Sequence, residues 1–314
     1  MWYELSHSFV FNTLNLDGKL ADALHFFIYD TIKIWFLLLT IIFAVSFLRT
    51  WVNTEYVRAH LQNKSPFYGH VAASLFGIVT PFCSCSAIPL FLGFIQARIP
   101  IGVTFSYLIS APMNNEIAIA MLFGIFGWKI TLLYIAFGLS VAILGGWLIG
   151  KMNMEKEVLL DVKPIEGELE ADLVKLSFKQ RSKEAWEYTL DIFKKIYLYV
   201  MLGVGVGAWI HGYIPTDFIA SYTGEGNPFA VIIAVIMGIP MYSNAAGVMP
   251  LVEVLTSKGM LLGTALSFMM AVTALSLPEA LILKKIISLK LIAVFFGIVG
   301  VGIITIGYLF NFIL

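Results

Sequence analysis

The chain has 314 residues, of which 59% are hydrophobic and 13% are charged, about half the charged share of a typical soluble domain. That balance excludes an ordinary soluble fold, and a formal net charge of zero leaves no basic surface for nucleic acid. At about 20 apolar residues for each crossing, the length allows roughly eight membrane segments. We therefore predict an all-α integral membrane protein.

Four uninterrupted apolar runs are predicted to cross the membrane. The first carries Trp35 near one end and Arg49 at the other, as anchoring at the two membrane surfaces requires. The four predicted spans are Thr31–Thr50, Lys129–Gly150, Ile196–Ile214 and Lys290–Leu309.

Two further apolar runs in each half contain polar breaks. In the first half, residues 66–126 are interrupted at Thr80–Ser86 and at Ser110–Glu116. In the second half, the breaks are Met241–Asn244 and Ser276–Glu279. Because proline ends a helix and each piece covers about half a bilayer, we predict broken or re-entrant helices that meet near the membrane midplane.

The centre of the chain has a different composition. Residues 151–195 are rich in charge, and their last part places Phe178, Trp186, Leu190 and Phe193 on one helical face, as in an interfacial helix. We therefore divide the chain into a first repeat (1–150), a charged cytoplasmic loop with an interfacial helix (151–192) and a second repeat (193–314).

The two halves resemble each other when the second is shifted by about 161 positions. The shared order of matches favours an internal duplication and places Glu116 close to Glu279. The matched pairs are Gly77 with Gly238, Gly102 with Gly263, Ser106 with Ser267, and Lys129 with Lys290.

Loop charges predict that the two halves have opposite orientations. The basic central loop is expected to be cytoplasmic, whereas His211–Asn227 carries neither Lys nor Arg and is expected to be external. The counterpart of that segment in the first half, Arg49–Lys64, is basic. An inverted repeat places both termini outside; the alternative, four crossings in each of two parallel halves, exposes more basic residues.

Secondary transporters with inverted repeats bind substrate where their broken helices meet. Here the only two cysteines, Cys83 and Cys85, lie at such a break, and both thiols could reach one soft ligand. The alternative is that these cysteines are small residues suited to tight packing. The substrate-binding candidates are Thr80, Pro81, Cys83, Ser84, Cys85, Ser86, Asn114, Asn115, Tyr242, Ser243 and Asn244.

Each half has one carboxylate at its second break. An ionisable residue inside a membrane is a candidate functional group, so Glu116 and Glu279 are candidates for proton coupling. Helix capping is the alternative: Asn114 and Asn115 could cap the helix that carries Glu116, and Ser276-x-x-Glu279 has the form of a capping box. For Glu279 the pattern favours capping; for Glu116 it favours neither role.

One motif of the chain resembles the motif of a known family. It reads Thr80-Pro81-Phe82-Cys83-Ser84-Cys85-Ser86 and is followed by Ile88-Pro89-Leu90 and Ser110-Ala111-Pro112. The family is the predicted permease family (YraQ-like permeases) that includes the ArsP-like efflux permeases for trivalent organoarsenicals. The resemblance implies a multi-pass permease of the inner membrane, in which Cys83 and Cys85 match the thiol pair of the family and bind a thiophilic small solute for efflux.

Other functions remain open at this level. The cysteines could exchange with external thiols in a membrane redox carrier, and six methionines between Met237 and Met270 would suit a copper(I) transporter. A channel or scaffold is a further alternative. We predict no enzyme, cofactor or resident metal; the expected partners are a small-molecule or metalloid substrate and membrane lipid, with a homo-oligomer left open.

Overall fold

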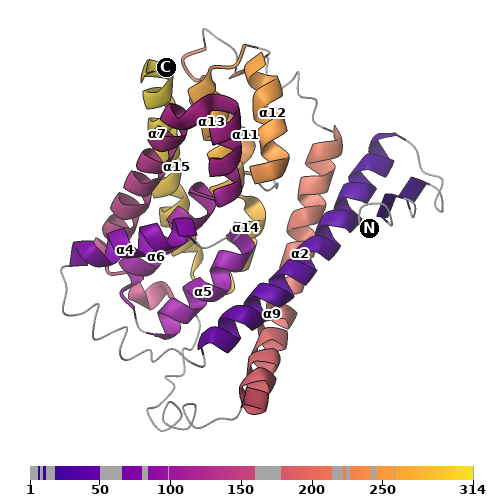
Figure 1. The fold of residues 1–314 in the computed structure, drawn as a ribbon, viewed down its shortest axis with the longest axis vertical. Coiled ribbons are helices and arrows are strands. Elements are labelled where there is room, and N and C mark those ends of the chain that lie inside the picture. The colour runs from indigo at the N-terminus through magenta and orange to yellow at the C-terminus, as the bar shows by residue number, and fades with distance from the viewer. Residues whose placement is uncertain are drawn as a thin grey trace. The chain divides into compact units, whose positions relative to one another are not determined.

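The structure is a computed structural model. It describes residues 6–7, 10–11, 18–49, 66–79, 84–97, 99–159, 178–213, 222–223, 227–241, 245–257 and 259–313. Within these ranges the chain is almost entirely helical, and the only pairing of extended backbone is an isolated bridge between Val158 and Ile287 (Figure 1). The prediction of an all-α protein is confirmed.

The first half contains five long helices. They are α2 (Lys19–Arg49), α4 (Pro66–Val79), α5 (Ser84–Gln96), α6 (Ile101–Met113) and α7 (Glu116–Lys151), followed by a short 3₁₀ turn, η2 (Glu155–Glu157). The second half contains α9 (Phe178–Tyr213), α11 (Ala230–Gly238), α12 (Ala245–Ser257), α13 (Leu262–Ala274), α14 (Leu277–Leu283) and α15 (Leu289–Ile313).

Helices end where the sequence predicted breaks. α4 ends at Val79, directly before the first break, and α6 ends at Met113 before Asn114 and Asn115. At Asn115 the backbone is extended, with φ −60° and ψ 135°, so one helix cannot continue into the next. The breaks of the second half likewise separate α11 from α12 and α13 from α14.

Among the described residues, three stretches are long and apolar enough to cross a membrane: Glu116–Lys151, Leu262–Leu283 and Leu289–Ile313. The predicted span Lys129–Gly150 is only part of α7, which already begins at Glu116. Gly127, with φ 80° and ψ 175°, separates the first part of α7 from the rest. Glycine adopts such a positive φ without steric cost, so the kink is placed by the sequence.

The predicted interfacial helix and the span after it form one helix. α9 runs without interruption through residue 193, where the sequence division placed the start of the second repeat. Trp186 and Phe178, two residues of the predicted interfacial face, make edge-on ring contacts with Phe43 and Phe47 of α2. This face therefore packs in part against another helix.

The helix boundaries recur with the offset found in the sequence. α12, α13 and α14 begin 161 positions after α5, α6 and α7 respectively. Close glycine contacts recur with the same spacing. A Cβ on Gly102 would lie 2.6 Å from the carbonyl oxygen of Gly146, and a Cβ on Gly263 would overlap the carbonyl oxygen of Gly307. These glycines let two helix backbones approach closely in each half.

The chain divides into two compact units, each of which uses segments from both halves. One contains Met1–Phe36, Tyr197–Ile282 and Gly300–Leu314; the other contains Leu37–Ile196 and Leu283–Val299. The division falls inside α2, α9, α14 and α15.

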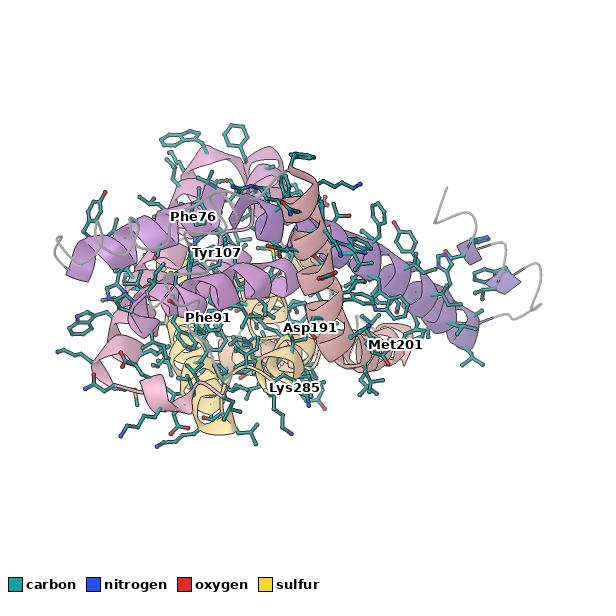
Figure 2. The ribbon with its side chains drawn as sticks, turned by 90° about the horizontal axis from the view of Figure 1, so that it is seen from below. Phe76, Phe91, Tyr107, Asp191, Met201 and Lys285 are labelled. Atoms are coloured by element: carbon teal, nitrogen blue, oxygen red, sulfur yellow. The ribbon has the colours of Figure 1, made fainter. Side chains whose placement is uncertain are left out.

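In the unit built mainly from the first half, α6 forms the centre. All of its residues are buried, and it packs against α4, α5 and α7. Ring contacts join these helices: the Phe91 and Phe105 centroids lie 5.3 Å apart, and those of Phe76 and Tyr107 lie 5.8 Å apart. Figure 2 labels Phe76, Phe91 and Tyr107, which come from α4, α5 and α6.

In the other unit, α13 takes the equivalent central place. It is buried except at Leu262 and Thr273 and packs against α11 and α12. A Cβ on Gly238 of α11 would lie 2.9 Å from the Cβ of Ala271. The end of α11 is therefore held directly against the last turns of α13.

The segment after α7 is tied to the segment before α15. The Leu159 N–H donates to the Ile286 carbonyl at 2.9 Å, and the Ser288 N–H donates to the Glu157 carbonyl at 2.8 Å. Lys290 lies 3.4 Å from the Glu157 carboxylate. A hydrogen bond from Ser288, together with Lys290, lowers the pKa of Glu157. Both linkers therefore form one small hydrogen-bonded structure.

Candidate functional site

The first two breaks of the chain converge on the C-terminal turn of α6. α4 reaches this turn through Gly77, where a Cβ would lie 2.8 Å from the Cβ of Ser110 and 3.0 Å from the Ala111 nitrogen. The chain therefore enters the cysteine-containing break beside the end of α6.

The chain leaves that break at the same end of α6. A connection of four residues joins α5 to α6, and Phe91 pairs with Phe105, so the two helices are antiparallel neighbours. Seven residues of α5 before Phe91 correspond to about 10 Å of helix at 1.5 Å per residue. The first turn of α5, which contains Ser84, Cys85 and Ser86, therefore lies toward the end of α6 that carries Asn114.

Asn114, a predicted substrate-binding residue, is completely buried at this end. Its Nδ2 donates to Ser110 Oγ at 3.3 Å, whereas its Oδ1 has no hydrogen-bond partner in the described part of the chain. The amide lies against Gly138 of α7, where a Cβ would overlap it. A glycine on the facing helix thus makes room for a buried amide with one open acceptor.

Asn115 has the capping role that the sequence offered as an alternative. Its Oδ1 accepts hydrogen bonds from the Ile117 and Ala118 N–H groups at 2.9 and 3.4 Å, which caps α7. Glu116 is the first residue of α7 and only partly buried, and its Oε2 has no partner among the described residues. Capping is therefore confirmed for Asn115.

A row of polar side chains between α4 and α6 was not predicted. His70 Nδ1 lies 2.8 Å from Ser106 Oγ, and Ser110 Oγ donates to the Ser74 carbonyl at 2.7 Å. With Asn114, these residues form a polar seam (His70, Ser74, Ser106, Ser110 and Asn114) through an otherwise apolar interface. The spacing of Ser106, Ser110 and Asn114, four residues each, places all three on one face of α6 and could have revealed the seam.

The second repeat has the same glycine contacts but not the polar seam. The equivalent positions, shifted by 161, are Val231, Val235, Ser267, Ala271 and Leu275, so only the serine remains. Ser267 Oγ donates to the Gly263 carbonyl of its own helix at 2.8 Å. The polar path to the break therefore belongs to the first repeat alone.

In the second repeat, the two breaks also meet. The Leu277 N–H, at the start of α14, donates to the Ile239 carbonyl, just past the end of α11, at 3.0 Å. The flank of the Met241–Asn244 break therefore contacts the Ser276–Glu279 break. Each repeat thus brings its own pair of breaks together.

The predicted capping box at Ser276 and Glu279 is wrong. Both residues are buried, with 1% and 0% of their surface exposed, yet Ser276 Oγ and both Glu279 carboxylate oxygens make no hydrogen bond within the described part of the chain. Glu116 and Glu279 lie close together in the repeat, as predicted, but not at the same position. Because α14 begins exactly where the offset places the start of α7, Glu279 corresponds to Ala118 and Glu116 to Leu277.

Several predicted site residues lie outside the described residues. They are Thr80, Pro81, Cys83, Tyr242, Ser243 and Asn244. Ser84, Cys85 and Ser86 are described as the helical first turn of α5, without their side chains. The binding role of these residues stays a prediction.

Comparison with known proteins identifies the family. A family model described as a predicted permease, the ArsP-like one, matches residues 19–312, nearly the whole chain. The chain belongs to this predicted permease family. The resemblance inferred from the cysteine motif is thereby confirmed, and the permease is a membrane protein.

The relatives of the permease are distant in sequence. UPF0718 protein MJ0584 of Methanocaldococcus jannaschii is 23% identical and covers 98% of both chains. UPF0718 protein YraQ of Escherichia coli is 21% identical, over 78% of the permease and 68% of YraQ. A putative two-component membrane permease complex subunit of Streptococcus mutans is 24% identical, over 61% of the permease and 62% of that subunit. No solved structure matches the permease.

Proposed function

We propose that the protein is an inner-membrane permease that exports a small thiophilic solute of the trivalent organoarsenical type. The observation that carries the proposal is the convergence of both flanks of the Cys83-Ser84-Cys85 segment on the end of α6. The Oδ1 of Asn114, which has no partner among the described residues, lies at this same end of α6. Two thiols and a buried polar group would thus share one region of a broken-helix permease.

The number of thiols suits a monosubstituted trivalent arsenical. Such a compound carries two hydroxyl groups and one organic group on arsenic. Each thiol forms one sulfur–arsenic bond and displaces one hydroxyl group, which leaves with the thiol proton as water, so arsenic is neither oxidised nor reduced. Inorganic arsenite has three exchangeable positions and would need a third thiol, and the chain has only two cysteines.

The linker hydrogen bonds support opposite orientations of the two repeats. They join residues 157–159, after α7, to residues 286–288, before α15. Four crossings in each of two parallel halves would put these linkers on opposite membrane surfaces, separated by a hydrocarbon core of about 30 Å. In the inverted arrangement both linkers lie on the cytoplasmic side, with the basic central loop.

Resistance assays with cysteine variants test the proposal. Cys83→Ser and Cys85→Ser are each expected to abolish resistance to methylarsenite in a sensitive bacterial host, because a single thiol cannot chelate arsenic. Met152→Leu, which replaces an exposed sulfur-containing residue, is the matched control and should keep full resistance. Membrane levels of each variant are measured by immunoblot.

The same assay separates the alternatives. Full methylarsenite resistance in both cysteine variants would remove the thiol mechanism. Protection against copper instead of arsenicals would favour a soft-metal transporter. Thiol labelling that changes with redox partners, in vesicles that accumulate no arsenical, would favour a redox carrier.

A further inference from the structure

The break between α13 and α14 holds three buried side-chain oxygens that have no hydrogen-bond partner among the described residues. They are Ser276 Oγ and the two carboxylate oxygens of Glu279, and Glu279 is completely buried. Buried polar atoms in proteins nearly always have a hydrogen-bond partner. A charged carboxylate without one is especially unfavourable in an apolar surrounding. The described residues therefore provide no donor for these oxygens.

The local sequence could satisfy these oxygens itself but does not. A Ser-x-x-Glu segment at a helix start normally closes a capping box, in which each side chain accepts from the backbone N–H of the other residue. At the equivalent position of the first repeat, Asn115 does cap its helix, through hydrogen bonds from Ile117 and Ala118. In the second repeat α14 begins at the equivalent position, but the side-chain oxygens of Ser276 and Glu279 accept no hydrogen bond from the described residues.

In the described part of the chain, the helices that flank this break carry no cation. α11 and α13 contain no titratable residue, and on α12 Glu253 is exposed. Lys284 and Lys285, the next charged residues along the chain, are both exposed. The C-terminal end of α13, which carries the negative end of the helix dipole, also faces the break. Protonation would remove the negative charge that makes a buried carboxylate unfavourable here.

We infer that Glu279 binds a proton at this break and that this proton is the coupling ion of the permease. One proton forms a single O–H bond with one carboxylate oxygen and is later released unchanged. A bare metal cation would need a shell of about six oxygen ligands, whereas the break offers three from side chains. We prefer Glu279 to Glu116, because Glu116 is only partly buried and, of its carboxylate oxygens, only Oε2 is buried without a partner among the described residues.

The coupling role rests on the proposed permease function, but proton binding can be measured without any substrate. The full-length protein in lipid nanodiscs is examined by infrared difference spectroscopy between acid and alkaline pH. The C=O band of a protonated carboxyl group is expected at acid pH and is expected to disappear in Glu279→Gln. Glu116→Gln, the matched control, is expected to keep it.

Two further variants keep the test decisive. Ser276→Ala removes the neighbouring hydroxyl group, so it is expected to shift the band without removing it. If Glu279→Gln does not fold, Glu279→Asp is used, and a displaced band is expected. A band unchanged in the Glu279 variants, or one lost in Glu116→Gln, would overturn the assignment. So would a band that weakens when sodium replaces potassium at constant pH.

Loss of methylarsenite resistance in Glu279→Gln, with proton binding established, would then link the site to transport.

Discussion

Asn114 is a buried amide that makes one hydrogen bond through Nδ2, while its Oδ1 has no partner in the described part of the chain. An unsatisfied buried acceptor costs about 1–3 kcal/mol, so this residue lowers stability where it lies. At the same position of the second repeat the residue is Leu275. A polar residue retained at such a cost fits a binding role better than a structural one.

We therefore predict that Asn114→Leu separates stability from transport. The midpoint of thermal unfolding should stay the same or rise by a few degrees, because the unpaired amide is removed, while methylarsenite resistance should fall at least tenfold. Asn311→Leu is the matched control, since Asn311 also has an unpaired Oδ1 and donates through Nδ2 to Thr264. It should leave resistance unchanged. A clearly lower unfolding midpoint for Asn114→Leu would instead assign the amide a structural role.

A second prediction concerns the cap of α7. Asn115→Ala removes the acceptor for two backbone N–H groups and should lower the free energy of unfolding by about 1 kcal/mol, measured by thermal unfolding in detergent. Asn115→Asp, which keeps an acceptor oxygen, should retain most of the stability. Equal losses in both variants would show that the hydrogen bonds of the cap do not contribute.

The sequence alone predicts the capping role correctly for one of these residues and wrongly for others. Asn115 could be recognised as a cap because its type and its place before an apolar helix are sufficient. Ser276 and Glu279 have an equally good capping pattern, yet their oxygens are unpaired. A pattern shows which hydrogen bonds are possible, but the packing of the surrounding helices decides whether they form.

At the level of helices, close glycine contacts hold α6 against α7. A Cβ on Gly146 would lie 2.5 Å from the Gly102 carbonyl oxygen and 2.7 Å from the Ser106 nitrogen, and one on Gly102 would lie 2.8 Å from the Gly150 Cα. Backbone atoms cannot turn aside as a flexible side chain can. We expect Gly146→Ala to destabilise the protein by about 1–3 kcal/mol, the usual cost of overpacking.

The control for this prediction is Gly124→Ala on the same helix. Nothing lies within 4 Å of a Cβ at Gly124, and alanine favours a helix by up to about 1 kcal/mol over glycine. Thermal unfolding should therefore show a lower midpoint for Gly146→Ala and an unchanged or higher one for Gly124→Ala. Equal midpoints would mean that α6 and α7 can separate without cost.

The positions of the helix ends could be predicted from proline, asparagine and charge. The partner of each helix face could not. Trp186 and Phe178 gave an amphipathic pattern typical of a membrane surface, but their rings contact α2. Periodicity shows that a face is apolar; only the three-dimensional arrangement shows what covers it.

For the whole molecule, the decisive prediction is topology. If the two repeats have opposite orientations, reporters fused to the N-terminus and to the C-terminus should both report an external location, and a reporter inserted between residues 160 and 177 should report the cytoplasm. Two cytoplasmic termini would contradict the inverted arrangement. The loop charges predicted this topology, but the hydrogen bonds between residues 157–159 and 286–288 had no signal in the sequence, because main-chain pairing leaves no motif.

The hydrogen bonds between residues 157–159 and 286–288 also indicate where the polypeptide could be divided into two fragments. They join the two halves at a point independent of the covalent link through residues 160–177, and Phe105 of α6 adds a ring contact with Phe295 of α15. A gene cut once within that link would encode two fragments that still carry these complementary contacts. The permease should therefore tolerate being made as two polypeptides that assemble in the membrane.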